Sequence, residues 1–140
     1  MRNELTILNA LKRTIEEGLE GADDSNVIID FPDIDKMPKA FTIFLQPNWS
    51  DYENLSTSSD SSTFDMSVFL ICKKDTRSNL TIRIYEKFNA LYLLLRQNTT
   101  LGGEADFTLL TDADFYPAVE GNQNVKAVEA SVAIRYTKDF

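Results

Sequence analysis

The spacing of apolar residues along the chain predicts two amphipathic helices. Over residues 3–19 and again over residues 79–97, apolar side chains recur every three or four positions, so that they share one side of a helix. The apolar stripe of the first helix consists of Leu5, Leu8, Leu11, Ile15 and Leu19. The stripe of the second consists of Leu80, Ile84, Phe88, Leu91 and Leu95, with Tyr85 and Tyr92 at its borders.

Alternating or continuous apolar runs predict five strands between and after these helices. The runs cover residues 27–31, 40–45, 64–72, 107–111 and 128–137. The last run is the clearest, because its even-numbered residues are apolar and its odd-numbered residues are mostly polar. Two helices laid on one face of a sheet would bury every stripe. We therefore expect a single α+β domain over residues 1–140, with a mainly antiparallel or mixed sheet of four to five strands and two helices packed on one face.

A polar segment, residues 46–62, separates the second and third predicted strands. Its strongly apolar members are Trp49, Tyr52 and Leu55, too few to offset the entropy of ordering seventeen residues. We expect a mobile polar loop here, and loops of this length are often functional. The two aromatic residues are candidate anchors for a partner, because they bury much area at little entropic cost. The alternative is that they fold back onto an open edge of the sheet.

The second predicted helix carries more apolar residues than one sheet needs. Ile82, Leu93 and Leu94 project outside its main stripe. Either the first helix covers this second side, or the side is exposed and meets another subunit. The candidate interface residues of the chain are therefore Trp49, Tyr52, Leu55, Ile82, Leu93 and Leu94.

The composition restricts the possible partners and surroundings. The chain has 140 residues, 14 basic and 22 acidic, and a net charge of −8, which disfavours specific binding to nucleic acid. The first residues do not read as a signal peptide, and no segment approaches the apolar length of a membrane span. We expect a protein that is made in a cytoplasm, not secreted, and free of membrane contact. Cys72, the single cysteine, lies in an apolar run and is expected to be a buried thiol.

Candidate chemistry is sparse. The chain has no histidine, which removes the commonest general base and most zinc and iron sites. Its glycines lack the neighbours that either nucleotide-binding motif requires. Asp112, Asp114 and Glu120 could offer oxygen ligands to calcium from one loop, but their spacing is not that of an EF-hand, and a solvated acidic loop is the simpler interpretation. We expect no catalytic residues, cofactor or metal, and no enzymatic activity.

The order of these elements resembles the tail-terminator (tail-completion) proteins of long-tailed bacteriophages. An amphipathic helix leads to a Pro-rich bend, DFPDIDKMPKA, and then to the strand pair FTIFLQP and FDMSVFLIC around the polar segment. The helix NLTIRIYEKFNALYLLL, the turn NTTLGG and the closing strand VEASVAIRY resemble the second half of that family. The likeness covers nearly the whole chain but rests on layout and not on a diagnostic motif.

The resemblance implies a structural role without catalytic residues. Such proteins assemble as homo-oligomeric rings, typically hexamers, that cap the tail tube and offer a surface to the head connector. It implies a virion protein of the tail or neck, made in the cytoplasm of a host bacterium. Two alternatives remain from the sequence: a monomeric module that binds a protein or ligand with its long loop, and another neck or head-completion protein.

Overall fold

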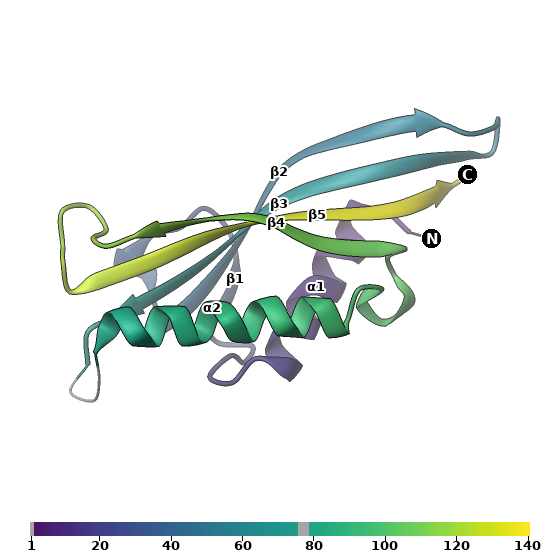
Figure 1. Ribbon diagram of the computed structural model, residues 1–140. Helices are drawn as coiled ribbons and strands as arrows, with labels where there is room; N and C mark the ends of the chain where they lie inside the picture. The colour runs from purple at the N-terminus through teal and green to yellow at the C-terminus, as the bar shows by residue number, and fades with distance from the viewer. Residues whose placement is uncertain (1, 76–78) are drawn as a thin grey trace.

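Five strands form one sheet in the computed structural model of the chain, which describes residues 2–75 and 79–140 (Figure 1). The strands are β1 (Val27–Ile29), β2 (Phe41–Asn54), β3 (Ser59–Lys73), β4 (Phe107–Tyr116) and β5 (Val125–Asp139). Their order across the sheet is β1-β2-β3-β5-β4. β1 runs parallel to β2, and every other neighbouring pair is antiparallel. The sheet is therefore mixed, and the predicted α+β class is confirmed.

Two helices lie on the same face of this sheet, as expected (Figure 1). They are α1 (Glu4–Gly18) and α2 (Leu80–Gln97), with the short 3₁₀ helices η1 (Ile34–Lys36) and η2 (Leu101–Gly103) in the connections. The Asn3 side chain begins α1 by accepting the backbone N–H of Thr6, and the Asn79 side chain begins α2 by accepting two backbone N–H groups. Both helix boundaries agree with the sequence prediction to within one residue.

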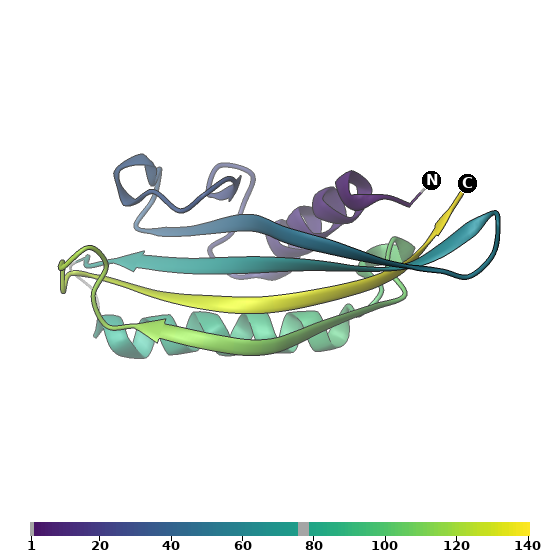
Figure 2. The ribbon, with the colours of Figure 1, turned by 90° about the horizontal axis from the view of Figure 1, so that it is seen from above.

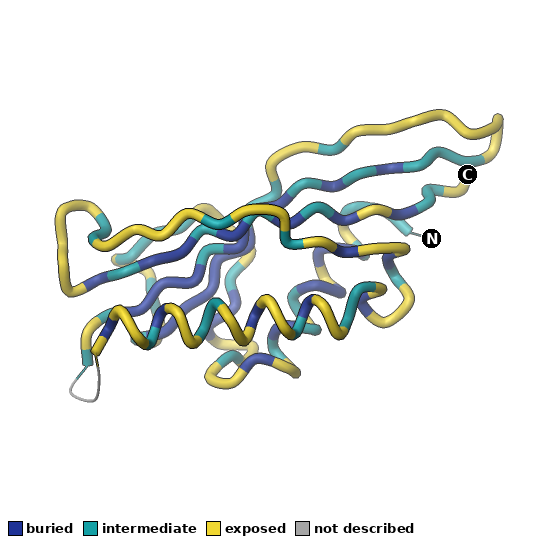
Figure 3. The backbone as a smooth tube through the Cα atoms, in the orientation of Figure 1, coloured by how far each residue is buried: buried dark blue, intermediate teal, exposed yellow. Residues whose placement is uncertain are grey.

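The core lies between the helices and the sheet. The even-numbered residues of β5 from Val128 to Tyr136 face the helices and are at most 1% exposed, which confirms the alternation read from the sequence. On the opposite face, a smaller cluster around Phe44 and Ile71 packs against side chains of the η1 segment. Figure 3 shows how the buried residues concentrate in the central strands, while β4 and the far end of β2 are mostly exposed.

The prediction of a loop over residues 46–62 is wrong. β2 continues to Asn54 and β3 begins at Ser59, so the segment forms the outer half of a long antiparallel hairpin. The two strands shift register between Pro47 and Trp49, which is a β-bulge, and then pair again to the tip. The prediction failed because it counted apolar residues within the segment only. β5 supplies the missing stabilisation, since it pairs with β3 along its whole length.

The prediction of an acidic loop after residue 111 is also partly wrong. β4 continues through Asp112 and Asp114 to Tyr116 beside β5, after a register shift between Leu110 and Asp112. Acidic residues lower strand propensity, but here they lie on a sheet edge, where charges are common. Glu120 lies outside the strand, with a φ of 52°.

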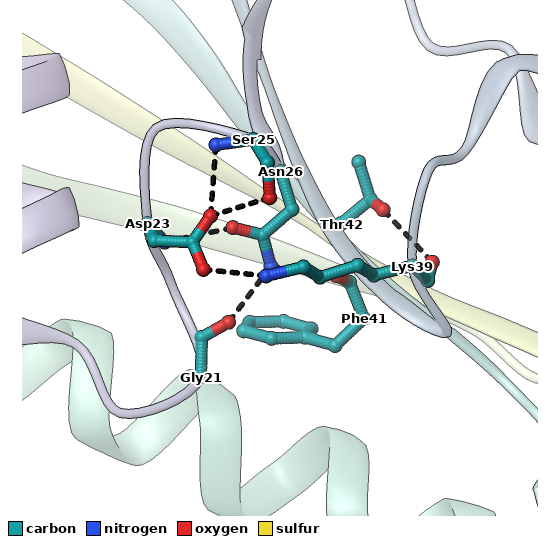
Figure 4. Close-up of polar contacts among 7 residues, drawn as sticks. All are labelled: Gly21, Asp23, Ser25, Asn26, Lys39, Phe41 and Thr42. Atoms are coloured by element: carbon teal, nitrogen blue, oxygen red, sulfur yellow. Dashed lines mark hydrogen bonds and ion pairs between the residues drawn. The ribbon is translucent and has the colours of Figure 1, made fainter.

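Buried Asn26 joins the first helix to the sheet (Figure 4). Its side-chain amide donates to the carbonyl oxygens of Gly21 and Phe41 at 2.7 and 2.9 Å, and its side-chain oxygen accepts the backbone N–H of Asp23 at 2.8 Å. The residue is fully buried, and its bond to Phe41 is buried as well, so the amide satisfies a carbonyl oxygen of the sheet that water does not reach. The Lys39 ammonium pairs with the Asp23 carboxylate. This hydrogen-bonded contact is the main reason why the pKa of Asp23 is lowered.

Candidate interaction surfaces

The outer half of the β2–β3 hairpin extends past the helices, and we call residues 49–65 the arm (Figure 1). At its tip, the backbone N–H groups of Leu55 and Ser56 both donate to the carbonyl oxygen of Ser59 at 3.1 Å. β5 accompanies the arm to the end, where Asp139 pairs with Ser59. The arm is therefore three-stranded over much of its length, which gives its side chains defined positions on two faces.

The three arm residues proposed from the sequence do not form one cluster. Trp49 is 54% exposed and lies on the sheet face away from the helices, where it pairs with Asp65. Tyr52 lies on the helix-facing side, and its hydroxyl donates to the Glu4 carboxylate. Leu55 is exposed at the tip. Trp49 and Leu55 are accessible to a partner, whereas the ring of Tyr52 is half-exposed and its hydroxyl already has a partner within the chain.

Glu4 anchors the arm to the first turn of α1. Its carboxylate accepts hydrogen bonds from Tyr52, from Tyr136 at 2.8 Å and from the Lys138 ammonium at 3.2 Å. Lys138 also lies 5.2 Å from the ring centroid of Tyr52. Burial raises the pKa of Glu4, but the hydrogen bonds from the two tyrosines and Lys138 outweigh it and lower the pKa from 4.5 to about 2. Burial and the same carboxylate raise the pKa of Tyr136.

Replacing Glu4 with glutamine is expected to lower the free energy of unfolding by about 1 to 2 kcal/mol at neutral pH. Because the pKa is lower in the folded state, the carboxylate stabilises the fold above pH 4.5, and this contribution is lost as the pH falls from 4.5 to about 2. Urea unfolding of both proteins across this range measures the difference. Glu17→Gln, on the outer side of α1, is the control and should change stability by less than about 0.5 kcal/mol. A difference that persists unchanged at the lowest pH would contradict this role of Glu4.

Two of the α2 candidates lie on the surface. Ile82 is 56% exposed and Leu93 is 57% exposed, and both project away from the sheet. Beside them, the ring of Tyr85 stacks on Phe115 of β4 at a centroid distance of 4.4 Å, and Phe88 meets Phe115 edge-on at 5.2 Å. The exposed apolar residues of α2 form a ridge on this side of the domain, which aromatic contacts to β4 support. The ridge consists of Ile82, Tyr85, Tyr92 and Leu93.

Leu94, the third α2 candidate, does not belong to this ridge. It packs against the buried core, and its Cδ1 atom lies so close to Gly18 of α1 that an added Cβ at Gly18 would be 2.4 Å away. The first helix thus covers this part of α2, which was one of the two arrangements considered from the sequence. Leu94 is a helix-packing residue and not a free interface residue.

One apolar surface was missed by the sequence analysis. The sheet face away from the helices has a groove of about 410 Å³ near the start of β4, lined by Thr63, Phe107, Leu109, Thr111, Ala133 and Arg135. Phe107 and Leu109 are 42% and 39% exposed, and Arg135 is exposed at the border. In the sequence, this surface corresponds to the uncharged run FTLLT, which predicts a short strand but not its position at the edge of the sheet.

The cysteine and the acidic side chains are possible reactive or metal-binding groups in the described residues. Cys72 is buried, and burial raises the pKa of its thiol to about 11. Within residues 2–75 and 79–140, no group of three or more acidic or cysteine side chains is placed to hold a metal ion. The helices described by the structure include none that is long and apolar enough to cross a membrane.

Comparison with known proteins shows a likeness among solved structures. No family model matches the chain, and no curated protein matches its sequence. Among solved structures, the fold is similar to the sheath/tube terminator of PVC, an extracellular contractile injection system, in its extended state. The TM-score is 0.61 at 13% sequence identity, and the match covers 100% of this chain but 58% of that one. The chain therefore spans a little over half the length of the terminator whose fold it shares.

Proposed function

We propose that this chain is a structural terminator protein, which assembles as a homo-oligomeric ring at the end of a tail or injection tube. The observation that carries the proposal is the likeness of the whole chain to a sheath/tube terminator. The element order, compared above with the tail terminators of bacteriophages, points the same way. In this role the protein acts by binding its own copies and the tube, and it needs no catalytic group.

The surfaces described above support assembly. The exposed ridge on α2 has the apolar character of a subunit interface, with Tyr85, Tyr92 and Leu93 all at least 45% exposed. The arm, with Trp49 and Leu55 accessible, extends far enough from the body to reach a neighbouring component (Figure 1). We propose a ring of about six subunits, with the tube on one side and the head connector of a phage particle on the other, in a virion tail or neck built inside a host bacterium.

Replacing both Ile82 and Leu93 with glutamate is expected to convert the ring to monomers, because the two added charges of each copy cannot be desolvated cheaply at a subunit contact. Both side chains are more than half exposed, so the free energy of unfolding should change by less than about 0.5 kcal/mol per site. Native mass spectrometry of the variant and the parent protein measures the change. The control carries the same added charge on exposed polar positions of α2, Thr81→Glu with Gln97→Glu, and should still assemble. A ridge variant that assembles like its parent would exclude this side of α2 from the interface.

A further inference from the structure

The sheet has two edges that are only partly covered. β1 pairs with β2 from Ile43 to Leu45 alone, and within the described residues no strand pairs with the outer side of β2 beyond that point. β4 forms the opposite border of the sheet, and the described part of the chain places no strand on its outer side. Backbone N–H and C=O groups on such edges are available to another chain.

These two free edges lie at the same level of the sheet. Strand pairing places Asp51 of β2 in one row with Phe107 of β4, through Thr63 and Arg135 of the central strands. Two rows along, on the same face of the sheet, Trp49 and Leu109 lie at the two ends, with Asp65 and Ala133 between them. The register shifts of the two edge strands also coincide, because Pro47 and Leu110 both belong to the row through Met66 and Val132.

The directions of the edge strands suit each other as well. β2 and β4 run in opposite directions, since each of the three steps from β2 through β3 and β5 to β4 is antiparallel. Copies related by rotation about an axis along the strands keep both strand direction and level. The β4 edge of one copy would then lie beside the outer half of β2 in the next copy, in an antiparallel orientation.

The first half of β4 is the unprotected part of its edge. Residues 107–110 are uncharged and two of their side chains are exposed, which is a hazard for uncontrolled pairing unless a partner covers them. The second half is blocked, because the Asp112 carboxylate accepts the backbone N–H of Ala113 at 2.8 Å and Asp114 adds a further charge. Pairing is thus favoured only at the level where the arm edge of the next copy is also free.

A positive charge lies beside the first half of β4, whereas the second half carries Asp112 and Asp114. Residues 46–62 contain three acidic residues and no basic residue, and Asp51 and Glu53 lie on the face away from the helices. On the same face, Arg135 borders the groove beside Phe107. Helix α2 lies along β4 on the other face of the sheet (Figure 2), so Arg135 is the basic residue that these carboxylates would meet. The acidic side chains of the arm therefore suit the groove beside Arg135 of a neighbouring copy.

We propose that residues 107–110 of one copy pair as antiparallel strands with residues 49–53 of the next copy, so that one sheet continues through the ring. Trp49 of the incoming arm lies over the groove beside Leu109, and Asp51 or Glu53 faces Arg135. The contact is head-to-tail, so it does not stop at a dimer, and it closes into a ring when the rotation from one copy to the next divides a full turn. This inference rests on the proposed function, because it names the surfaces that the ring would join.

Paired cysteine substitutions test this arrangement. Asp51→Cys and Phe107→Cys lie at the two ends of one row, three strand spacings or roughly 14 Å apart within a single copy. A bis-maleimide cross-linker shorter than that separation therefore links them only between copies. The double variant is expected to give a ladder of covalent oligomers up to the ring. Each single variant should give monomers, and a mixture of the two single variants should give dimers only. The native Cys72 is buried and does not compete.

The outcomes separate this inference from the proposed function. A ring by native mass in which the double variant is not linked, or in which either single variant forms dimers, overturns the edge pairing and leaves the ring. A parent protein that never forms a ring overturns both. If the first pair of substitutions itself prevents assembly, the pair two rows along, Trp49→Cys with Leu109→Cys, decides by the same criteria.

Discussion

Replacing Asn26 with leucine is expected to lower the free energy of unfolding by about 3 kcal/mol. The leucine has a similar volume but makes none of the three hydrogen bonds of the amide. Without them, the buried carbonyl oxygen of Phe41 is left without a partner, and the partly buried carbonyl oxygen of Gly21 and backbone N–H of Asp23 lose theirs. Each such group costs about 1 to 3 kcal/mol when it stays unsatisfied, and partial relaxation reduces the sum.

Denaturant unfolding of the Asn26 variant measures this cost. The matched control is Ser25→Ala, one position earlier in the same turn, where an exposed hydroxyl that contacts Asp23 is removed. Its effect should stay below about 1 kcal/mol, since water replaces the lost bond. If the Asn26 variant were no less stable than this control, the amide would not be what holds the α1–β1 connection to the sheet.

Replacing Leu94 with glutamate is expected to lower stability, whereas replacing Leu93 with glutamate is expected to impair assembly. Leu94 packs against the core and beside Gly18, so Leu94→Glu forces a charge into the contact between the helices and should cost about 2 to 3 kcal/mol of stability. Leu93 is 57% exposed, so Leu93→Glu should leave stability within about 0.5 kcal/mol and act on assembly alone.

Thermal or urea unfolding together with native mass distinguishes the two neighbours. The account requires a destabilised protein from Leu94→Glu and a folded protein with impaired assembly from Leu93→Glu. Equal losses of stability at both positions would mean that Leu93 is also held by the fold. Equal stability with equal loss of assembly would mean that Leu94 belongs to the interface after all.

The spacing of apolar residues along the chain was sufficient to predict the helices and most of the buried core. The stripe of Leu80, Ile84, Leu91 and Leu95 is buried as its spacing indicates, because helix geometry alone decides which side chains share a face. The alternation ending at Tyr136 is buried for the corresponding reason in a strand. These elements could be read from the sequence because neighbours along the chain determine them.

The arm and the β4 edge depend on contacts between distant parts of the chain. The β3 strand of the arm is paired with β5, and Glu4 anchors Tyr52 from 48 positions away. Leu94 and Leu93 are adjacent in sequence, and only the position of α1 decides which of them is covered. The alignment of Asp51 with Phe107 follows from the register of three strand pairs. Exposed apolar residues could therefore be predicted where exposure follows the helix period, and could not where it follows from the order of the strands.

The most direct test of the proposed function is the native mass of the parent protein over a concentration series, with electron microscopy of any large species. The account predicts a closed ring of about six copies with a central opening. A monomer at every accessible concentration would contradict it and favour a module that binds its partner as a single copy.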